Sequence, residues 1–255
     1  MDFEENDLKL KTLKNYWGFN EFRKSQEEII DNVLQKKDIL ALLPTGGGKS
    51  LCYQLPAIIL KGTCLVISPL VALMEDQVNQ LEKKGIEATY LNSSHSFREI
   101  DRILDNVIYG SIKILYISPE RIKSKLFEAR FKKMNISFIA VDEAHCISEW
   151  GNDFRPDFRT ISKLREWKSN LTFIALTASA TKSVIIDIQD QLLFKNKNVI
   201  RKSYLRKNIS YKIIDAIHKE TVLLKIIKKE CSIIYTKTRK KAEEISKLLN
   251  KNKFR

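Results

Sequence analysis

The stretch from Asp38 to Ser50, DILALLPTGGGKS, decides the fold. Its apolar first half predicts a buried strand, and its polar second half predicts a tight turn that opens a helix. Three consecutive glycines let backbone N–H groups turn toward an anion, because glycine has no side chain to block the approach. The stretch therefore looks like a phosphate-binding loop between a strand and a helix.

Each residue type in this loop suits a nucleotide. The Lys49 ammonium would neutralise the β and γ phosphates, and the Ser50 hydroxyl would ligate Mg²⁺. Leu43 stands where the strict pattern G-x-x-x-x-G-K-[ST] has its first glycine, so a glycine-rich turn that binds nothing is the alternative interpretation. The predicted phosphate-binding residues are Thr45, Gly46, Gly47, Gly48, Lys49 and Ser50.

Composition bounds the class of protein. The chain has 255 residues, 44% of them hydrophobic, which is enough for one full core and part of a second. No run of eighteen or more apolar residues occurs, and the start, MDFEEND, is acidic rather than basic. These features predict neither a membrane span nor secretion, with the cytoplasm as the default location.

The cysteines carry no recognisable metal or disulfide pattern. Cys52, Cys64, Cys146 and Cys231 are scattered singly, and no C-x-x-C pair occurs. This spacing argues against a zinc site and against a disulfide framework. We interpret all four as reduced core residues.

The net charge of +14 is confined to one part of the chain. Residues 195–255 hold 19 basic and 5 acidic residues, whereas residues 1–194 hold 26 of each sign. A basic C-terminal segment is compatible with nucleic acid. A lysine-rich, isoleucine-rich composition also follows from genome base bias, so charge alone does not identify DNA as the partner.

The order of apolar runs predicts an α/β fold. Residues 1–37 have the apolar spacing of helices, broken near residues 17–19, and a helix is expected over 181–194. The near-continuous hydrophobicity of the strands predicts a doubly wound, mainly parallel sheet with helices on both faces. The expected strands are 38–43, 64–68, 87–91, 112–118, 137–142 and 171–177.

A second, smaller pattern follows a polar, basic connection at residues 195–208. Strands are expected at 209–214 and 231–236, and helices at 220–229 and 238–249. Two strands and two helices cannot bury both faces of a sheet, so we expect the chain to stop inside a second domain. The predicted organisation is residues 1–37 helical, 38–200 the first α/β domain and 201–255 an incomplete second lobe.

An acidic pair follows the expected strand 137–142. Asp142 would hold Mg²⁺ through water, and Glu143 would orient and activate the water that attacks a nucleotide phosphate. An Asp-Glu pair can also be a simple helix cap with an acidic first turn. Its occurrence together with the glycine-rich loop favours the catalytic interpretation.

Taken in order, the motifs resemble one family. PTGGGKS (44–50), SPLVALMEDQV (68–78), ISPER (117–121), DEAH (142–145) and the aromatic-rich segment after it resemble the RecQ family of superfamily 2 DNA helicases. FNEFRKSQ (19–26) resembles the family's adenine-reading motif, LTASAT (176–181) its coupling motif, and SIIYTKTR (232–239) the first motif of its second lobe. The resemblance covers essentially the whole chain from about residue 13.

The resemblance implies a RecA-like ATP-binding lobe, ATP and Mg²⁺ as cofactors, and 3′ to 5′ movement along single-stranded or forked DNA in repair and recombination. Protein partners cannot be read from the sequence. The implied adenine-reading residues are Phe19, Arg23 and Gln26; the implied DNA-binding and coupling residues are Ser68, Trp150, Phe154, Arg155 and Phe158, with Thr177, Ser179 and Thr181 in the coupling motif. Aromatic faces stack on unpaired bases, and an arginine pairs with phosphate.

Several positions depart from the family pattern. Asn152 occupies the place of a usual histidine, Lys24-Ser25 replaces Pro-Gly, and Ser179 replaces threonine. The family's later second-lobe motifs, with their arginine finger, have no counterpart, nor have its zinc-binding and winged-helix domains. The alternative interpretations are therefore a truncated, non-hydrolysing ATP- or DNA-binding module, a gene fragment, or an unrelated P-loop ATPase.

Overall fold

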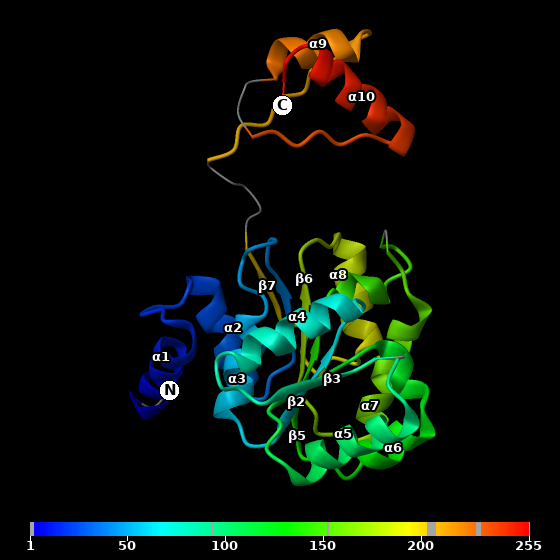
Figure 1. Cartoon of the computed structure of the whole chain (residues 1–255). Helices are drawn as coiled ribbons and strands as arrows, with labels where there is room; N and C mark the ends of the chain where they lie inside the picture. Colours follow the sequence, from blue (N-terminus) through cyan, green and yellow to red (C-terminus); the bar gives the residue numbers. More distant parts are fainter. Residues whose placement is uncertain (1–2, 93, 152, 203–207, 228–230, 255) are drawn as a thin grey trace. The chain divides into compact units, whose positions relative to one another are not determined.

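The computed structural model describes residues 3–92, 94–151, 153–202, 208–227 and 231–254 (Figure 1). The chain divides into two compact units, residues 1–204 and 205–255. No helix in the described part of the chain is long and apolar enough to cross a membrane.

The first unit is built on a seven-stranded sheet in the order β3-β4-β2-β5-β6-β1-β7, and all of its strand pairs are parallel. Parallel neighbours need crossover connections, which the intervening helices supply. The strands are β1 (Ile39–Leu42), β2 (Thr63–Ile67), β3 (Ala88–Leu91), β4 (Ile114–Ile117), β5 (Ile136–Val141), β6 (Phe173–Thr177) and β7 (Val199–Arg201).

Helices cover both faces of this sheet (Figure 1). The α-helices of the first unit are α1 (Phe3–Trp17), α2 (Lys24–Leu34), α3 (Leu51–Ile59), α4 (Val71–Glu82), α5 (Phe97–Tyr109), α6 (Lys125–Phe131), α7 (Lys163–Trp167) and α8 (Lys182–Gln191). Three 3-10 helices join them: η1 (Pro119–Lys123), η2 (Ala144–Ile147) and η3 (Pro156–Ser162).

Alternation along each strand decides which core a side chain enters. Leu40 and Leu42 of β1 join a core with α5 to α8, whereas Ile39 and Ala41 join a core with α2, α3 and α4. Both sets are fully buried, because successive side chains of a strand point to opposite faces of the sheet. Strands covered on both faces are therefore apolar at most of their positions, as the sequence shows.

A buried ion pair joins the amino end of β1 to helix α7. Asp38 lies 2.7 Å from the Arg165 guanidinium, and it also accepts hydrogen bonds from the backbone N–H groups of Phe173 and Lys195. Arg165 in turn donates to the carbonyls of Leu171 and Leu192. A buried charge needs such partners, because desolvation without them is costly.

The predicted α/β class is confirmed, and six of the seven strands fall within two residues of their predicted positions. The sequence analysis missed β7 and took its residues for a connection. Only two of its three residues are apolar, and it lies at the sheet edge, where it pairs with β1 alone. A short edge strand has too little pattern for sequence reasoning to detect it.

The second unit corrects two strand predictions. Residues 209–214 and 231–236 form no strand in the structure, whereas α9 (Lys219–Ile226) and α10 (Arg239–Lys251) lie close to their predicted positions. Strands are stable only as members of a sheet, and these segments have no paired neighbour among the described residues. Their apolar side chains are instead exposed: Ile213 and Tyr235 are 101% and 91% accessible.

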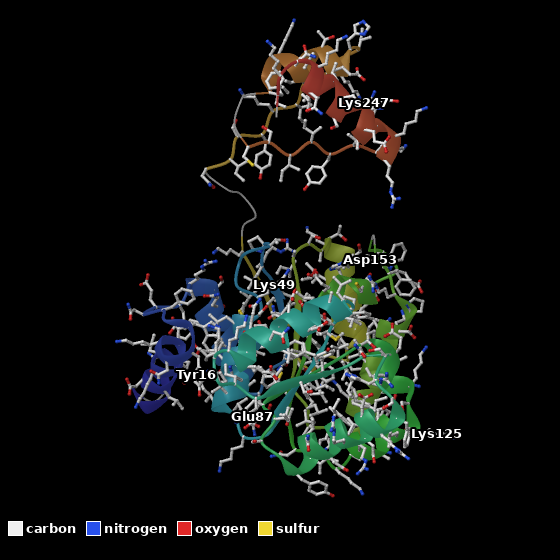
Figure 2. All side chains as sticks on the ribbon, viewed as in Figure 1. Tyr16, Lys49, Glu87, Lys125, Asp153 and Lys247 are labelled. Atoms are coloured by element: carbon white, nitrogen blue, oxygen red, sulfur yellow. The ribbon has the colours of Figure 1, made fainter. Side chains whose placement is uncertain are left out.

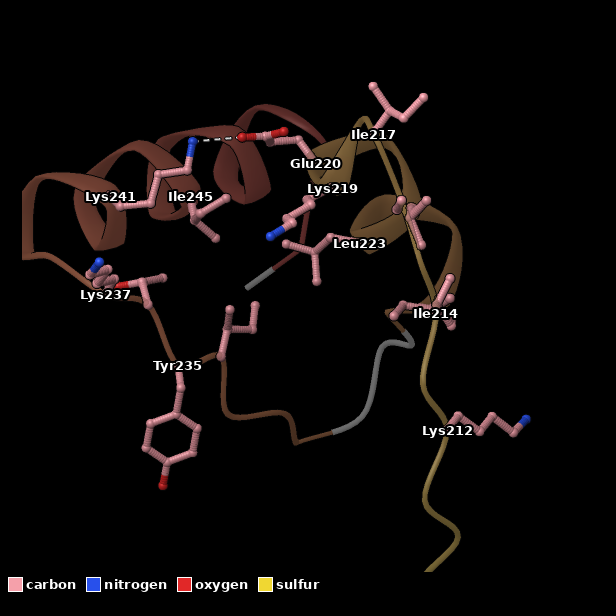
Figure 3. A pocket seen from close by; sticks show the side chains of 15 residues that line it. Lys212, Ile214, Ile217, Lys219, Glu220, Leu223, Tyr235, Lys237, Lys241 and Ile245 are labelled. Carbon is pink, nitrogen blue, oxygen red and sulfur yellow. Dashed lines mark hydrogen bonds and ion pairs between the residues drawn. The ribbon is translucent and has the colours of Figure 1, made fainter. Parts of the chain in front are cut away.

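The apolar side chains of this unit line an open groove of about 730 Å³ (Figure 3). Its walls include Ile214, Leu223 and Tyr235, together with Ile245, the buried residue of α10. The ion pair between Lys241 and Glu220, at 2.6 Å, joins the two helices. The unit therefore has an apolar face that its own described residues leave open.

Candidate active site

Four neighbouring strands end at one edge of the sheet with the predicted site residues. β2, β5, β6 and β1 are consecutive in the sheet order and parallel, so the segments that follow them lie side by side. These segments begin at Ser68, Asp142, the end of β6 at Thr177, and the glycine-rich loop 44–50. Ligands of such sheets bind at this carboxyl edge.

The glycines of the loop are required by its backbone. Gly46 and Gly48 have φ values of +74° and +79°, which side-chain-bearing residues rarely adopt. A Cβ at Gly47 would lie 2.7 Å from the carbonyl oxygen of Pro44, whose turn is closed by a hydrogen bond from the Gly47 N–H. The loop thus leaves room for an anion that a side chain would fill.

Two residues of the predicted adenine-reading motif contact this loop directly. The Arg23 guanidinium donates to the Gly46 carbonyl at 2.9 Å. The buried Gln26 amide nitrogen lies 3.4 Å and 3.3 Å from the carbonyl oxygens of Gly47 and Gly48. The Gln26 side-chain oxygen accepts from the Arg23 N–H at 3.1 Å, so both ends of the Gln26 amide are engaged.

A cavity of about 900 Å³ lies beside these contacts. Phe19, Arg23 and Gln26 line one part of it, and Gly46, Gly48 and Ser50 line another. Phe19 is 57% exposed, which leaves its ring free to stack on a flat ligand. The structure therefore brings the predicted adenine-reading and phosphate-binding residues to one cavity.

A chain of polar contacts links the loop to the acidic pair and then to β6. The Lys49 ammonium lies 3.5 Å from Glu143 Oε1, and Glu143 Oε2 lies 3.3 Å from His145 Nδ1. His145 Nδ1 also lies 2.9 Å from the hydroxyl of Thr177. Direct polar contacts thus link side chains from the glycine-rich loop, the DEAH motif and the end of β6.

The backbone of Glu143 is strained. Its φ of +47° and ψ of +46° place it in the left-handed region, which costs a non-glycine residue about 1–3 kcal/mol. The contacts of its carboxylate with Lys49 and His145 hold it there. Strain of this kind at the end of a buried strand is typical of a functional position.

Charges at the site shift the pKa values of the acidic pair in opposite directions. Burial, together with a smaller contribution from the neighbouring Glu143 charge, raises the pKa of Asp142 to about 6. The hydrogen bond from His145 and the Lys49 charge lower the pKa of Glu143. Contacts with Cys146 and then Glu143 raise the pKa of His145. Glu143 therefore stays ionised at neutral pH.

Asp142 and Ser50 supply oxygen atoms of the kind that Mg²⁺ prefers. Asp142 is 8% exposed, and its carboxylate accepts only the Glu143 N–H at 3.0 Å among the described residues. Burial raises the pKa of Tyr53 on α3, and the charge of Asp142 contributes to the increase. A carboxylate and a hydroxyl next to the phosphate loop fit a small, hard cation.

The aromatic residues of the segment after the acidic pair differ in their exposure and in their contacts. Trp150 is 75% exposed, and the Phe154 ring lies under the Arg159 guanidinium at 5.3 Å. Arg155 donates to the Pro69 carbonyl at 3.2 Å, which joins this segment to the one after β2. Asn152 lies outside the described residues.

Phe158 corrects an expectation. The sequence predicts that Phe158 contacts DNA, but the residue is fully buried in the core that α5 to α8 form against the sheet. A ring with no accessible surface cannot stack on a base. Its position on η3, after the loop has returned to the sheet, explains its burial.

The remaining predicted site residues differ in burial and in hydrogen bonding. Ser68 is 2% exposed, and its hydroxyl has no hydrogen-bond partner within the described ranges, so contact with a phosphate requires the segment after β2 to move. Thr177 is buried against His145. Ser179 is exposed, and Thr181 caps α8 by accepting from the Val184 N–H.

Sequence reasoning missed the role of His145. The sequence shows it only as the last residue of DEAH. The structure shows it between Glu143 and Thr177. No spacing rule points from residue 145 to residue 177, because only the pairing of β5 with β6 brings them together. Cys231 is a further correction, since it is exposed rather than buried.

The sequence model of the DEAD/DEAH box helicase family matches residues 23–188 of the chain. Over 248 aligned residues the chain is 41% identical to the ATP-dependent DNA helicase RecQ of Bacillus subtilis. The alignment covers 95% of this chain and 42% of that protein. The chain is 41% identical over 255 residues to RecQ of Pasteurella multocida, with 98% and 40% covered.

These alignments confirm the resemblance to RecQ helicases. The chain spans about two fifths of the length of these curated relatives. Among solved structures, the DUF1998 helicase MrfA matches with a TM-score of 0.67 at 18% identity, over 96% of this chain and 41% of that one. At this identity the likeness concerns the fold alone.

Proposed function

This chain belongs to the DEAD/DEAH box helicase family, and from that premise we propose that it forms the ATP-binding motor portion of a RecQ-type, 3′ to 5′ ATP-dependent DNA helicase. The observation that carries the proposal is the contact chain from Lys49 through Glu143 and His145 to Thr177. A glycine-rich turn that binds no ligand does not require a contact between Lys49 and the strained Glu143.

ATP is the proposed substrate. Phe19 and Gln26 would recognise the adenine, and Gly46, Gly48 and Ser50 of the loop line the same cavity. The loop backbone and Lys49 would hold the phosphates. Ser50 and Asp142 would hold Mg²⁺, which supplies neutralisation of phosphate charge when bound. Arg23 and Gln26 already contact the loop carbonyls, so recognition of the base and the shape of the phosphate loop are linked.

Glu143 is the proposed water-activating group. In the structure Lys49 pairs with it, and a γ phosphate would compete for the same ammonium. Release from Lys49 leaves the carboxylate free to orient water toward that phosphate, with His145 still in contact. Phosphoryl transfer requires mainly positioning and charge neutralisation, which these groups provide.

DNA is the proposed partner, in single-stranded or forked form. Trp150 offers an exposed ring for stacking, and Arg155 joins its segment to the one after β2. Thr177, Ser179 and Thr181 follow β6, where Thr177 contacts His145. DNA bound at these segments would act on the hydrolytic residues through His145. The proposed place of action is the cytoplasm or nucleoid, where DNA is found.

We assign residues 1–37 to an adenine-reading helical region, 38–200 to the RecA-like ATP-binding lobe and 201–255 to the start of a second lobe. One observation favours a second candidate function, a non-hydrolysing ATP- or DNA-binding module. Residues 208–227 and 231–254 form two helices but no strand, so the described part of the second unit lacks a sheet. In the family a second lobe completes the ATP site.

Steady-state ATP hydrolysis by the purified chain, with and without single-stranded DNA, tests the proposal. We expect turnover that DNA stimulates and that Lys49→Ala removes, while the matched variant Lys61→Ala, an exposed lysine beyond the far end of α3, leaves it unchanged. Turnover no higher than that of Lys49→Ala, with ATP binding intact, would select the binding module instead. A chain that binds neither ATP nor single-stranded DNA would contradict both candidate functions.

A further inference from the structure

Three potential metal ligands meet beside the proposed active site. His145 and Cys146 are consecutive on η2, and Asp153 lies on the loop that follows. Their ligand atoms all lie within 4.8 Å of one another. Figure 2 shows Asp153 at the same edge of the sheet as Lys49.

The spacing of the three is close to that of a tetrahedral site. Zn²⁺ lies about 2.0–2.3 Å from nitrogen, oxygen and sulfur ligands, which places the ligands roughly 3.3–3.8 Å apart. The Cys146 thiol already lies 3.7 Å from Asp153 Oδ2 and donates a hydrogen bond to that carboxylate. The other pairs of ligand atoms lie at most 4.8 Å apart, about an ångström more than such a site requires.

The surroundings of His145 orient it as a metal ligand requires. Its Nδ1 contacts the Thr177 hydroxyl at 2.9 Å and Glu143 Oε2 at 3.3 Å. Such contacts fix the ring of a metal-binding histidine and leave Nε2 for the ion. His145 and Asp153 also line a cavity of about 430 Å³ together with Trp150 and Thr181, which provides access and an open fourth position.

We propose that His145, Cys146 and Asp153 form a binding site for Zn²⁺ or a similar borderline-soft divalent cation, separate from the Mg²⁺ site at Ser50 and Asp142. The ion replaces the thiol proton, which is released to solvent. Thiolate and imidazole ligands select such ions over Mg²⁺, which prefers oxygen. Binding would pin the segment that carries Trp150 and Arg155 to η2, next to Glu143.

The same atoms would also meet if the thiol and Asp153 merely anchored a loop by a hydrogen bond. The two interpretations differ in one measurable property, because a loop anchor has no affinity for metal. The site does not require ATP hydrolysis to be observed, so its failure and the failure of the proposed helicase function are distinguishable.

Titration of the full chain with Co²⁺, a coloured substitute for Zn²⁺, tests the site. We expect a sulfur-to-cobalt charge-transfer band and the visible bands of tetrahedral cobalt, both removed by Zn²⁺ and unaffected by excess Mg²⁺. Cys146→Ala and Asp153→Asn should each weaken binding by about 100-fold or more, since even residues behind the ligands contribute about 10- to 100-fold.

Matched controls separate this site from others on the chain. Cys231→Ser removes the exposed thiol, and Glu149→Gln neutralises another acid of the same segment; both should leave the titration unchanged. Asp153 is exposed, so Asp153→Asn keeps the test valid if Cys146→Ala fails to fold. A chain without the charge-transfer band, a band that survives in Asp153→Asn, or one lost in Cys231→Ser would overturn the proposal.

Discussion

The Lys49 ammonium lies 3.5 Å from the Glu143 carboxylate, although 94 positions separate the two residues in the chain. The contact joins the phosphate loop after β1 to the acidic pair after β5. It pairs two partly buried charges of opposite sign. In the proposed mechanism a phosphate would compete with Glu143 for Lys49, so the proposal couples nucleotide binding to the state of Glu143.

Glu143→Gln should separate ATP binding from hydrolysis. The amide keeps the size of the side chain but cannot act as a base, so hydrolysis should fall by about 10² to 10⁴-fold while ATP still binds. Phosphate release and titration with a fluorescent ATP analogue measure the two properties. Glu87→Gln, an exposed acid before β3 at the opposite edge of the sheet, is the control (Figure 2). Unchanged hydrolysis in Glu143→Gln would exclude this residue as the base.

Asp142→Asn should stabilise the protein in a pH-dependent manner. Because burial raises the pKa of Asp142 from 3.8 to about 6, its ionised form opposes folding by about 3 kcal/mol above pH 7. This opposition is relieved as the pH falls through 6, and about half remains at pH 5. The asparagine oxygen can still accept the Glu143 N–H, so the variant should gain stability at pH 7.5 and less at pH 5.

Urea unfolding at the two pH values, without nucleotide or metal, measures this difference. Asp190→Asn is the control, because its side chain is 55% exposed and pairs only with Lys197 among the described residues. Its effect should stay within about 0.5 kcal/mol at both pH values. A destabilised Asp142→Asn at pH 7.5 would show that the carboxylate has a compensating partner.

Gly48→Ala should impair adenine recognition through Gln26. A Cβ at Gly48 would lie 2.1 Å from the Gln26 amide nitrogen, so the amide must leave the loop. The preference for ATP over GTP should fall by about tenfold, as expected from losing one or two hydrogen bonds. Gln26→Ala should give the same loss, and the double variant little more, because both remove one interaction.

The control for this change is Gly85→Ala. Gly85 has a φ of +74°, similar to that of Gly48, but a Cβ there would meet no atom within 4 Å. It should cost about 1 kcal/mol or more of stability and leave nucleotide preference unchanged. Competition of ATP and GTP for a fluorescent nucleotide measures the preference. Equal effects of Gly48→Ala and Gly85→Ala would mean that backbone strain, rather than Gln26, is responsible.

Arg165→Ala should destabilise the first unit strongly. The guanidinium is buried with Asp38 and lies 4.3 Å from the Phe173 ring centre, so its removal leaves an uncompensated buried carboxylate. We expect a loss of about 3–5 kcal/mol in the free energy of unfolding, measured with urea. Lys132→Ala, which removes an exposed pair with Glu128, should cost about 0.5 kcal/mol or less. A similar loss in the two variants would contradict this interpretation.

Much of the fold was predictable because its signals are local. The glycine-rich loop and six strands are recognisable in short runs of residues, and the buried parallel strands are apolar at most of their positions. Strand β7 and residues 209–214 show the limits of that reasoning. β7 exists because β1 offers it an edge, whereas 209–214 is apolar enough for a strand but has no paired neighbour in the described part of the chain.

The sequence by itself determined the family, the α/β class and the residue types of the phosphate loop and acidic pair, because these are set by contiguous motifs. Only the tertiary structure decided which side chains meet. It placed Gln26 on the loop carbonyls, His145 between Glu143 and Thr177, and Cys146 beside Asp153. It also moved Phe158 from a proposed DNA surface into the core. Such contacts depend on strand order and on the return path of a loop, which no local spacing encodes.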